Sequence, residues 1–216
     1  MSGSGCCGNE GCGCNPKVPE AEAEATDPGG ALNWTQDDHF FALARLASKN
    51  STCVKTHTGV ALAKNGQLIS TSCNLCSPEG KKYGEAVEKC PREGMKTGTG
   101  YELCAPVHAE VMGCLNAMFA VSQRSPTQEV MRKFAGHLTP NPDEVRAAFT
   151  PRELEALNGA TCYLAGHYWA CDNCIAFLEA VGINRTEIKL DPTTSKETEE
   201  RYKARGITKD VPPGSD

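Results

Sequence analysis

Apolar residues recur along the chain at two spacings, one typical of helices and one typical of strands. Helical spacing follows the capping-box pattern Thr35-Gln-Asp-Asp38, with apolar positions at Phe40, Phe41, Leu43, Ala44 and Ala47. Residues 59–64 and 67–72 have the composition of strands, and the Asn65-Gly66 pair between them is a strong hairpin signal. The sequence therefore predicts a helix followed by a β-hairpin.

Two further helical runs each begin beside residues that can bind a metal ion. One run follows the stretch 104–110 and has apolar positions at Val111, Leu115, Met118 and Phe119. The other follows the stretch 169–174, ends at the helix stop Gly182, and has apolar positions at Ile175, Phe177, Leu178 and Val181. A short apolar strand at 161–164 precedes the second run, and Ile188-Lys-Leu190 follows it.

The remaining internal segments are polar. Residues 73–100 form a long loop, and residues 122–158 form an insert with helix starts at Ser125-Pro126 and at Thr150-Pro-Arg-Glu153. Helices that alternate with short strands after an initial hairpin indicate an α/β fold, a three-layer α/β/α sandwich with a mixed central sheet.

Composition changes at both ends of the chain. Residues 1–31 are rich in glycine, cysteine and acidic residues, so we expect a flexible leader before a domain spanning 32–190. The leader's cysteines form either an auxiliary metal or redox site, or part of a segment without a specific function. Residues 191–216 are expected to be a charged, peripheral tail.

Charge and cysteine content narrow the class of protein. The 216 residues carry a formal net charge of -5, which disfavours a non-specific nucleic-acid binder. No apolar run approaches the ~20 residues of a membrane span, and the N-terminus lacks the features of a secretory signal. The 13 cysteines therefore indicate metal ligands and reduced thiols in the cytoplasm rather than disulfides.

His108, Cys171 and Cys174 together predict a catalytic zinc site. They give a zinc ion three protein ligands and leave the fourth position open, as in catalytic rather than structural sites. Cys171 and Cys174 are spaced i, i+3 at a helix start, where the free N–H groups favour thiolates. Zinc lowers the pKa of water to about 7, and Glu110 lies two residues after the histidine, where it can transfer protons. H-x-E and P-C-x-x-C form the signature of zinc deaminases.

The loop before His108 contains candidate ligands for a second, structural zinc. These are Cys76, Cys90 and Cys104, with Cys73 or a histidine from elsewhere as the fourth ligand. Their spacing matches no standard zinc finger. Free thiols are the alternative.

Motifs throughout residues 34–190 resemble the deoxycytidylate (dCMP) deaminase family. They are Ser51-Thr-Cys53, the hairpin 59–72, Asn74, Cys90-Pro-Arg92, the stretch 98–104, Val107-His-Ala-Glu110 and Gly159-Ala-Thr-Cys-Tyr163. The resemblance implies the cytidine-deaminase fold, one catalytic zinc, a dCMP-like substrate and a homo-oligomer, either a hexamer or a dimer. It also implies, as in some members, a structural zinc and the effectors dCTP and dTTP.

Carried over by position, the resemblance makes His108, Cys171 and Cys174 the zinc ligands and Glu110 the proton shuttle. Asn74 and Ala109 are then substrate-binding positions, Asn74 matching the asparagine that contacts the sugar. The chain departs from the family around this centre. The Gly-Tyr-Asn-Gly loop reads Ser72-Cys-Asn-Leu75, Ala170 replaces proline, and Met112 replaces asparagine. A connection about two residues longer places His167, Tyr168 and Trp169 near the site, where aromatic rings could stack on a base.

The sequence thus predicts a zinc-dependent hydrolase that deaminates a cytosine nucleotide, with dCMP as the leading substrate. Lys55 and Arg92 are candidate phosphate contacts. Modified pyrimidine nucleotides and polynucleotide bases are alternative substrates, the latter disfavoured by the acidic charge. A catalytically silent zinc-binding scaffold is the alternative from another class, and it would not need Glu110.

Overall fold

The computed structural model describes residues 35–95, 99–136, 140–167 and 170–188. The predicted leader and tail lie outside these residues, as do Tyr168 and Trp169. The described strands are β1 (Gly59–Lys64), β2 (Gln67–Cys73), β3 (Thr161–Ala165) and β4 (Arg185–Ile188). The described helices are α1 (Gln36–Ser48), α2 (Ala109–Val121), α3 (Gln128–Lys133), α4 (Pro142–Ala147), α5 (Pro151–Leu157) and α6 (Asp172–Ala180).

The sheet has the strand order β2-β1-β3-β4 and is mixed. β1 pairs antiparallel with both β2 and β3, whereas β3 pairs parallel with β4 across the connection that contains α6. The predicted hairpin is confirmed, with Asn65 and Gly66 both at positive φ and Lys64 paired with Gln67.

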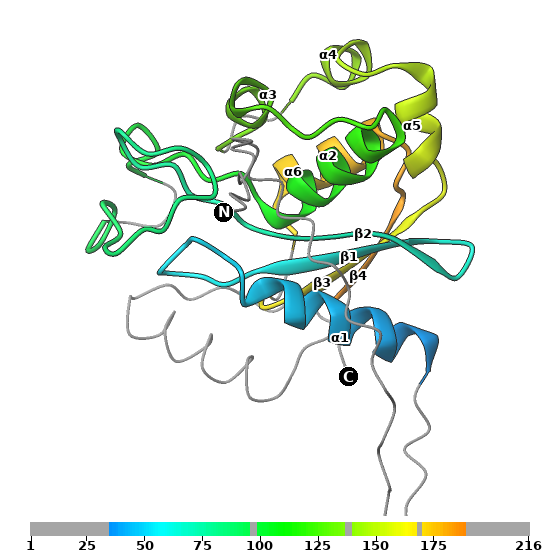
Figure 1. The fold of residues 1–216 in the computed structure, drawn as a ribbon, viewed down its shortest axis with the longest axis horizontal. Coiled ribbons are helices and arrows are strands. Elements are labelled where there is room, and N and C mark those ends of the chain that lie inside the picture. The colour runs from blue at the N-terminus through cyan, green and yellow to red at the C-terminus, as the bar shows by residue number, and fades with distance from the viewer. Residues whose placement is uncertain (1–34, 96–98, 137–139, 168–169, 189–216) are drawn as a thin grey trace, which may run out of the picture. The chain divides into compact units, whose positions relative to one another are not determined.

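Successive side chains along β1 point to opposite faces of the sheet, so the core has one part on each face. Val60 and Leu62 of β1 pack with α2 and α6, whereas Ala61 and Ala63 pack with Phe40 of α1. The small side chains on the second face let α1 lie close to the sheet. Figure 1 shows α1 on one face of the sheet, with α2 and α6 on the other. The predicted three-layer α/β/α architecture is confirmed.

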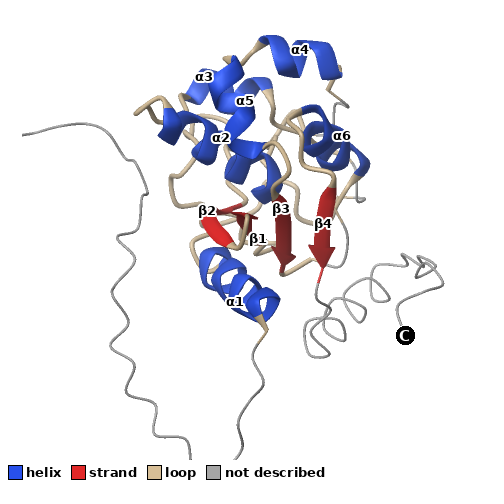
Figure 2. Cartoon of the chain, turned by 90° about the vertical axis from the view of Figure 1, so that its right-hand side faces the viewer, coloured by secondary structure: helices blue, strands red, loops and turns tan. Residues whose placement is uncertain are grey.

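The short helices α3, α4 and α5 lie on the same side of the sheet as α2 and α6 (Figure 2). Glu153 of α5 fixes one of them in place, because its buried carboxylate accepts hydrogen bonds from Ser122 Oγ at 2.7 Å and from Arg124 at 2.6 Å. The predicted capping box at Thr150 is confirmed and uses the same carboxylate. Glu153 thus joins the end of α2 to the start of α5.

Two boundaries and one helix differ from the sequence-based expectation. The helix expected at Ser125-Pro126 begins after Thr127, whose side chain accepts from Val130 N and caps it. The helix α4, capped by Asn141, was not predicted. The strand after α6 is residues 185–188, earlier than the apolar run 188–190, because pairing with β3 places Ile188 opposite Leu164.

In the part of the chain that the structure describes, no helix is both long enough and apolar enough to cross a membrane.

Candidate metal centre

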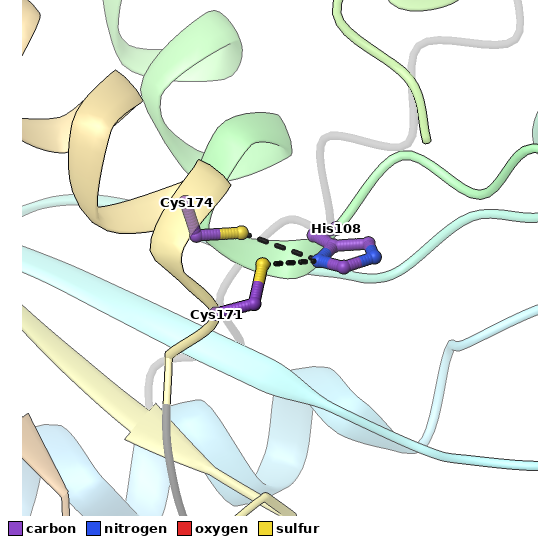
Figure 3. Close-up of side chains that lie close together, drawn as sticks. All are labelled: His108, Cys171 and Cys174. Atoms are coloured by element: carbon purple, nitrogen blue, oxygen red, sulfur yellow. Dashed lines mark hydrogen bonds between the residues drawn. The ribbon is translucent and has the colours of Figure 1, made fainter. Parts of the chain in front are cut away.

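Two helix starts converge beside the sheet, and each begins with a potential metal ligand. His108 is the N-cap of α2 and Cys171 is the N-cap of α6, both with extended backbone. Neither side chain makes the hydrogen bond that would cap its own helix. Neither side chain therefore acts as a helix cap, and the two side chains point toward one another instead (Figure 3).

The three predicted zinc ligands lie together. His108 Nδ1 is 3.2 Å from Cys174 Sγ and 3.4 Å from Cys171 Sγ. The ligand atoms of these residues all lie within 4.8 Å of one another, a grouping unique among the described residues. His108 and Cys171 are half-buried, and Cys174 is buried.

This donor set fits a tetrahedral zinc ion. With Zn–N bonds of about 2.0–2.1 Å and Zn–S bonds of about 2.3 Å, the nitrogen and each sulfur should be about 3.5 Å apart. The observed separations of 3.2 and 3.4 Å are close to that value. Nδ1 faces both sulfurs, so Nδ1 would be the ligand nitrogen. One imidazole and two thiols also match the ligand types that zinc prefers.

Protonation of the thiols must change when a metal binds. Hydrogen bonding with Cys171, together with burial, raises the pKa of Cys174 well above its ordinary value. Zinc binding requires the thiolate, so it must displace this proton, and metal affinity should fall as the pH falls.

Glu110 lies beside the same group of side chains. It is in the first turn of α2 and its side chain is hydrogen-bonded with that of Cys174. Only 4% of the residue is exposed, and burial raises the pKa of its carboxyl. A buried carboxyl with a raised pKa beside a metal site is suited to accept a proton and release it again.

The predicted substrate residue Asn74 lies next to the segment that carries His108. Leu75 and Val107 exchange two backbone hydrogen bonds, of 3.0 and 2.9 Å. The side chain of Asn74 is buried and hydrogen-bonded to Ser51 and to the backbone of residues 56 and 58. The structure thus places Asn74 near the metal centre with most of its hydrogen-bonding capacity occupied.

Of the other predicted substrate residues, the structure describes Ala109 and His167 but not Tyr168 and Trp169. Ala109, fully buried, is the first residue of α2, and His167 is half-buried just after β3. Lys55 and Arg92 are brought together, with Lys55 Nζ donating to the Arg92 carbonyl at 3.4 Å. The Arg92 guanidinium lies 3.9 Å from the centre of the Tyr101 ring.

A second group of thiols lies in the loop region. Cys76 is hydrogen-bonded through its side chain with Cys104 and Cys53, which raises the pKa of Cys76 and lowers the pKa of Cys104 and Cys53. Cys76 and Cys104 belong to the predicted second zinc set, but Cys53 does not. Cys73 ends β2, and Cys90 lies in a turn that its carbonyl closes with Glu93 N. Cys53 was missed as a ligand candidate, although its motif Ser51-Thr-Cys53 was one of those that carry the family resemblance.

Comparison with known proteins gives one curated relative and remote structural similarities. No protein-family model matches the chain. A deoxycytidylate deaminase of Schizosaccharomyces pombe is 32% identical over 83 residues, which are 38% of this chain and 25% of the relative. The matched region therefore spans about a quarter of that relative's length.

Two solved structures of dCMP deaminase from the cyanophage S-TIM5 are similar at 15% identity. The apo structure gives a TM-score of 0.38 and covers 76% of this chain and 90% of its own. The complex with dCMP and dUMP gives a TM-score of 0.36 and covers 70% of this chain and 95% of its own. The resemblance predicted from the motifs is confirmed at the level of sequence: over 83 residues, this chain is similar to a deoxycytidylate deaminase.

Proposed function

We propose that this chain is a zinc-dependent hydrolase of the dCMP deaminase family, with the cytidine-deaminase fold. Its reaction would convert a cytosine nucleotide, with dCMP as the leading substrate, and water into the uracil nucleotide and ammonia. The supporting observation is the juxtaposition of His108, Cys171 and Cys174 with a buried glutamate in contact with Cys174. The sequence similarity to a deoxycytidylate deaminase supports the same proposal.

His108 Nδ1 and the two thiolates would hold the zinc ion, which when bound lowers the pKa of a water to about 7. Glu110 would accept a proton from the attacking water and deliver it to the ring nitrogen of the base. It would then take the remaining proton from the hydroxyl now on C4 and give it to the departing amine, so that ammonia leaves and the C4 carbonyl forms. Burial keeps bulk water away from this carboxyl, and its raised pKa suits a group that is protonated and deprotonated in each turnover.

The proposal extends to a second, structural zinc bound by the thiols of Cys53, Cys76 and Cys104. The hydrogen bonds of Cys76 with Cys53 and with Cys104 support it, with Cys73 or Cys90 as candidates for the fourth ligand. Such a site would tie residues 51–53, the loop after β2 and the segment before α2 together.

Metal analysis tests both sites. We expect two zinc ions per wild-type chain. Cys171→Ser should remove one and abolish ammonia release, whereas Cys76→Ser should remove the other and lower stability. If the wild-type chain binds one zinc ion and Cys76→Ser still binds it, the loop cysteines are free thiols and the second site is wrong. Unchanged zinc in Cys171→Ser would remove Cys171 from the ligand set.

The family resemblance also supports a homo-oligomer, a hexamer or a dimer, and dCTP and dTTP as effectors. Light scattering with and without these nucleotides tests the assembly.

Ammonia release from a panel of cytosine bases, nucleosides and nucleotides is the experiment that tests the proposed function. The panel should include modified cytosine nucleotides and single-stranded DNA and RNA. We expect the highest kcat/KM with dCMP. Absence of ammonia from every member of the panel with zinc-loaded protein would contradict the proposal and favour a silent scaffold.

A further inference from the structure

The segment of residues 56–58, which connects α1 to β1, is held at the end of the sheet near the metal centre. Asn74 Oδ1 accepts a hydrogen bond from Thr58 N at 2.9 Å, and Asn74 Nδ2 donates to the Thr56 carbonyl at 2.8 Å. The backbone N–H of Asn74 donates to the Thr58 carbonyl at 3.1 Å. Asn74 therefore extends the pairing of β1 with β2 beyond its last pair, Gly59 with Cys73.

Gly166 closes the other side of this segment. A Cβ atom at residue 166 would lie 2.1 Å from the His57 carbonyl oxygen, so the backbone of Gly166 approaches the peptide of His57 directly. Gly166 also has φ of +80°, which favours glycine. Residues 56–58 are thus clamped between Asn74 and Gly166, and we name them the clamped segment.

The clamped segment is connected to both halves of the metal centre. Leu75, next to Asn74, is hydrogen-bonded to Val107, which precedes His108. On the opposite side, Gly166 directly follows β3, and Cys171 lies five residues further along the chain. A shift of the clamped segment would therefore disturb the approach to the ligands from each side.

The hydrogen-bonding capacity of the Asn74 amide is nearly filled. Ser51 Oγ donates to Oδ1 at 2.8 Å, so Oδ1 accepts two hydrogen bonds, from Ser51 and Thr58. One of the two Nδ2 hydrogens is used by Thr56. The amide can therefore offer a substrate at most one N–H. With the protein it makes three hydrogen bonds, to Ser51, Thr56 and Thr58.

We infer that Asn74 is a positioning residue, which acts on the reaction by fixing residues 56–58 against the end of the sheet, next to the Leu75–Val107 pairing that precedes His108. The predicted effect of Asn74 on activity rests on the proposed function, whereas its effect on residues 56–58 does not. It differs from the expectation that Asn74 acts chiefly by contacting the sugar. Misplacement of a positioning group by about 1 Å can cost about 100-fold in rate.

Amide hydrogen exchange and kinetics of Asn74→Ala test the inference. We expect the Thr58 amide to lose its protection, zinc content to stay near wild type, and kcat/KM to fall about 10- to 100-fold. The matched control is Asn116→Ala, because the hydrogen bond of Asn116 Nδ2 to Ser72 Oγ in β2 is long, at 3.4 Å. The control should leave Thr58 exchange and kcat/KM unchanged.

Ser51→Ala provides a milder variant in case Asn74→Ala does not fold. It removes one donor to Asn74 Oδ1, so it should raise Thr58 exchange and lower kcat/KM in the same direction. Ser51 Oγ also contacts the Thr56 and Asn74 carbonyls and accepts a hydrogen bond from Cys53 N. The part of its effect on kcat/KM that acts through the Asn74 amide should therefore disappear in the Asn74→Ala background. Additive effects of the two substitutions on kcat/KM would contradict the inference.

The outcomes separate this inference from the proposed function. If Asn74→Ala raises KM while Thr58 stays protected, Asn74 acts on the substrate directly and the inference is wrong. If the wild-type chain releases no ammonia from any substrate, the proposed function fails. The exchange of Thr58 then still reports whether Asn74 holds the clamped segment.

Discussion

Two buried glutamates of this chain have opposite chemical surroundings. Glu110 is enclosed by the core beside the metal centre, and burial raises the pKa of its carboxyl. Glu153 is equally buried, but hydrogen bonds from Thr150, Ser122 and Arg124 outweigh the effect of burial and lower its pKa to about 2. The first carboxyl is suited to move protons, whereas the second is held as a permanent anion that joins two helices.

The lowered pKa of Glu153 predicts a pH-dependent contribution to stability. The unfolded chain binds a proton at this residue near the ordinary value of 4.5, and the folded chain near 2. The stabilisation is therefore fully present above pH 4.5 and is lost as the pH falls toward 2. After allowance for the exposed Arg124, we expect it to be about 2 kcal/mol at pH 7.

Denaturant unfolding of Glu153→Gln between pH 7 and pH 3 measures this contribution. The difference in the free energy of unfolding from wild type should shrink as the pH falls below 4.5. Glu155→Gln is the control, because Glu155 is 73% exposed and its ion pair with Lys64 is long at 3.7 Å. It should change stability by less than about 0.5 kcal/mol at every pH. A difference for Glu153→Gln that does not depend on pH would contradict the assignment.

At the residue level, the sequence was sufficient to predict which candidate ligands lie together, but not what surrounds them. H-x-E and C-x-x-C have fixed spacings before helices, so local sequence predicts where His108 and Cys171 lie. Cys53 reaches Cys76 only through the tertiary pairing of residues 51–58 with the end of β2. No spacing along the chain encodes that contact, and the same holds for the three partners of Asn74.

Among the elements, α2 is the one whose position most directly determines the site, since it carries both His108 and Glu110. Gly113 lies on the face of α2 that packs on β1. A Cβ atom there would be 2.8 Å from Val60 Cγ2 and 3.5 Å from Leu62 Cγ. Val60 is fully buried and β-branched, so it has little freedom to move away. Glycine thus permits the close approach of helix and sheet.

Gly113→Ala should therefore destabilise the protein, although alanine ordinarily stabilises a helix relative to glycine. In an unconstrained helix, alanine is more stable than glycine by about 1 kcal/mol. Here we expect overpacking to destabilise the protein by about 1–3 kcal/mol instead and to lower kcat/KM as α2 shifts. Thermal or denaturant unfolding decides the sign, and a more stable variant would contradict the close packing.

Element boundaries were predicted well where a local signal coincided with the tertiary packing. The capping boxes at Thr35 and Thr150 and the turn at Asn65-Gly66 fixed their elements. The helix α4 had a start signal in Asn141-Pro142, but it buries only Val145 and shows no apolar periodicity. The position of β4 depends on its register against β3, which the apolar residues at 188–190 do not specify.

For the whole molecule, the three-layer fold explains how distant segments form one centre. The candidate metal ligands come from two helix starts that are 63 residues apart, at His108 and Cys171. The parallel connection through α6 places the second helix start at the same end of the sheet as the first. Helices alternating with short strands after the hairpin predicted the three-layer fold.

The central claim is that Glu110 transfers protons at a zinc site formed by His108, Cys171 and Cys174. Glu110→Gln keeps the shape of the side chain but removes the carboxylate. Glu102→Gln is the matched control, since Glu102 is exposed and lies eight residues before Glu110 in the chain. Zinc content and ammonia release should be measured together on each protein. We expect Glu110→Gln to retain wild-type zinc and lose ammonia release, with Glu102→Gln unchanged. Normal ammonia release by Glu110→Gln would contradict the account.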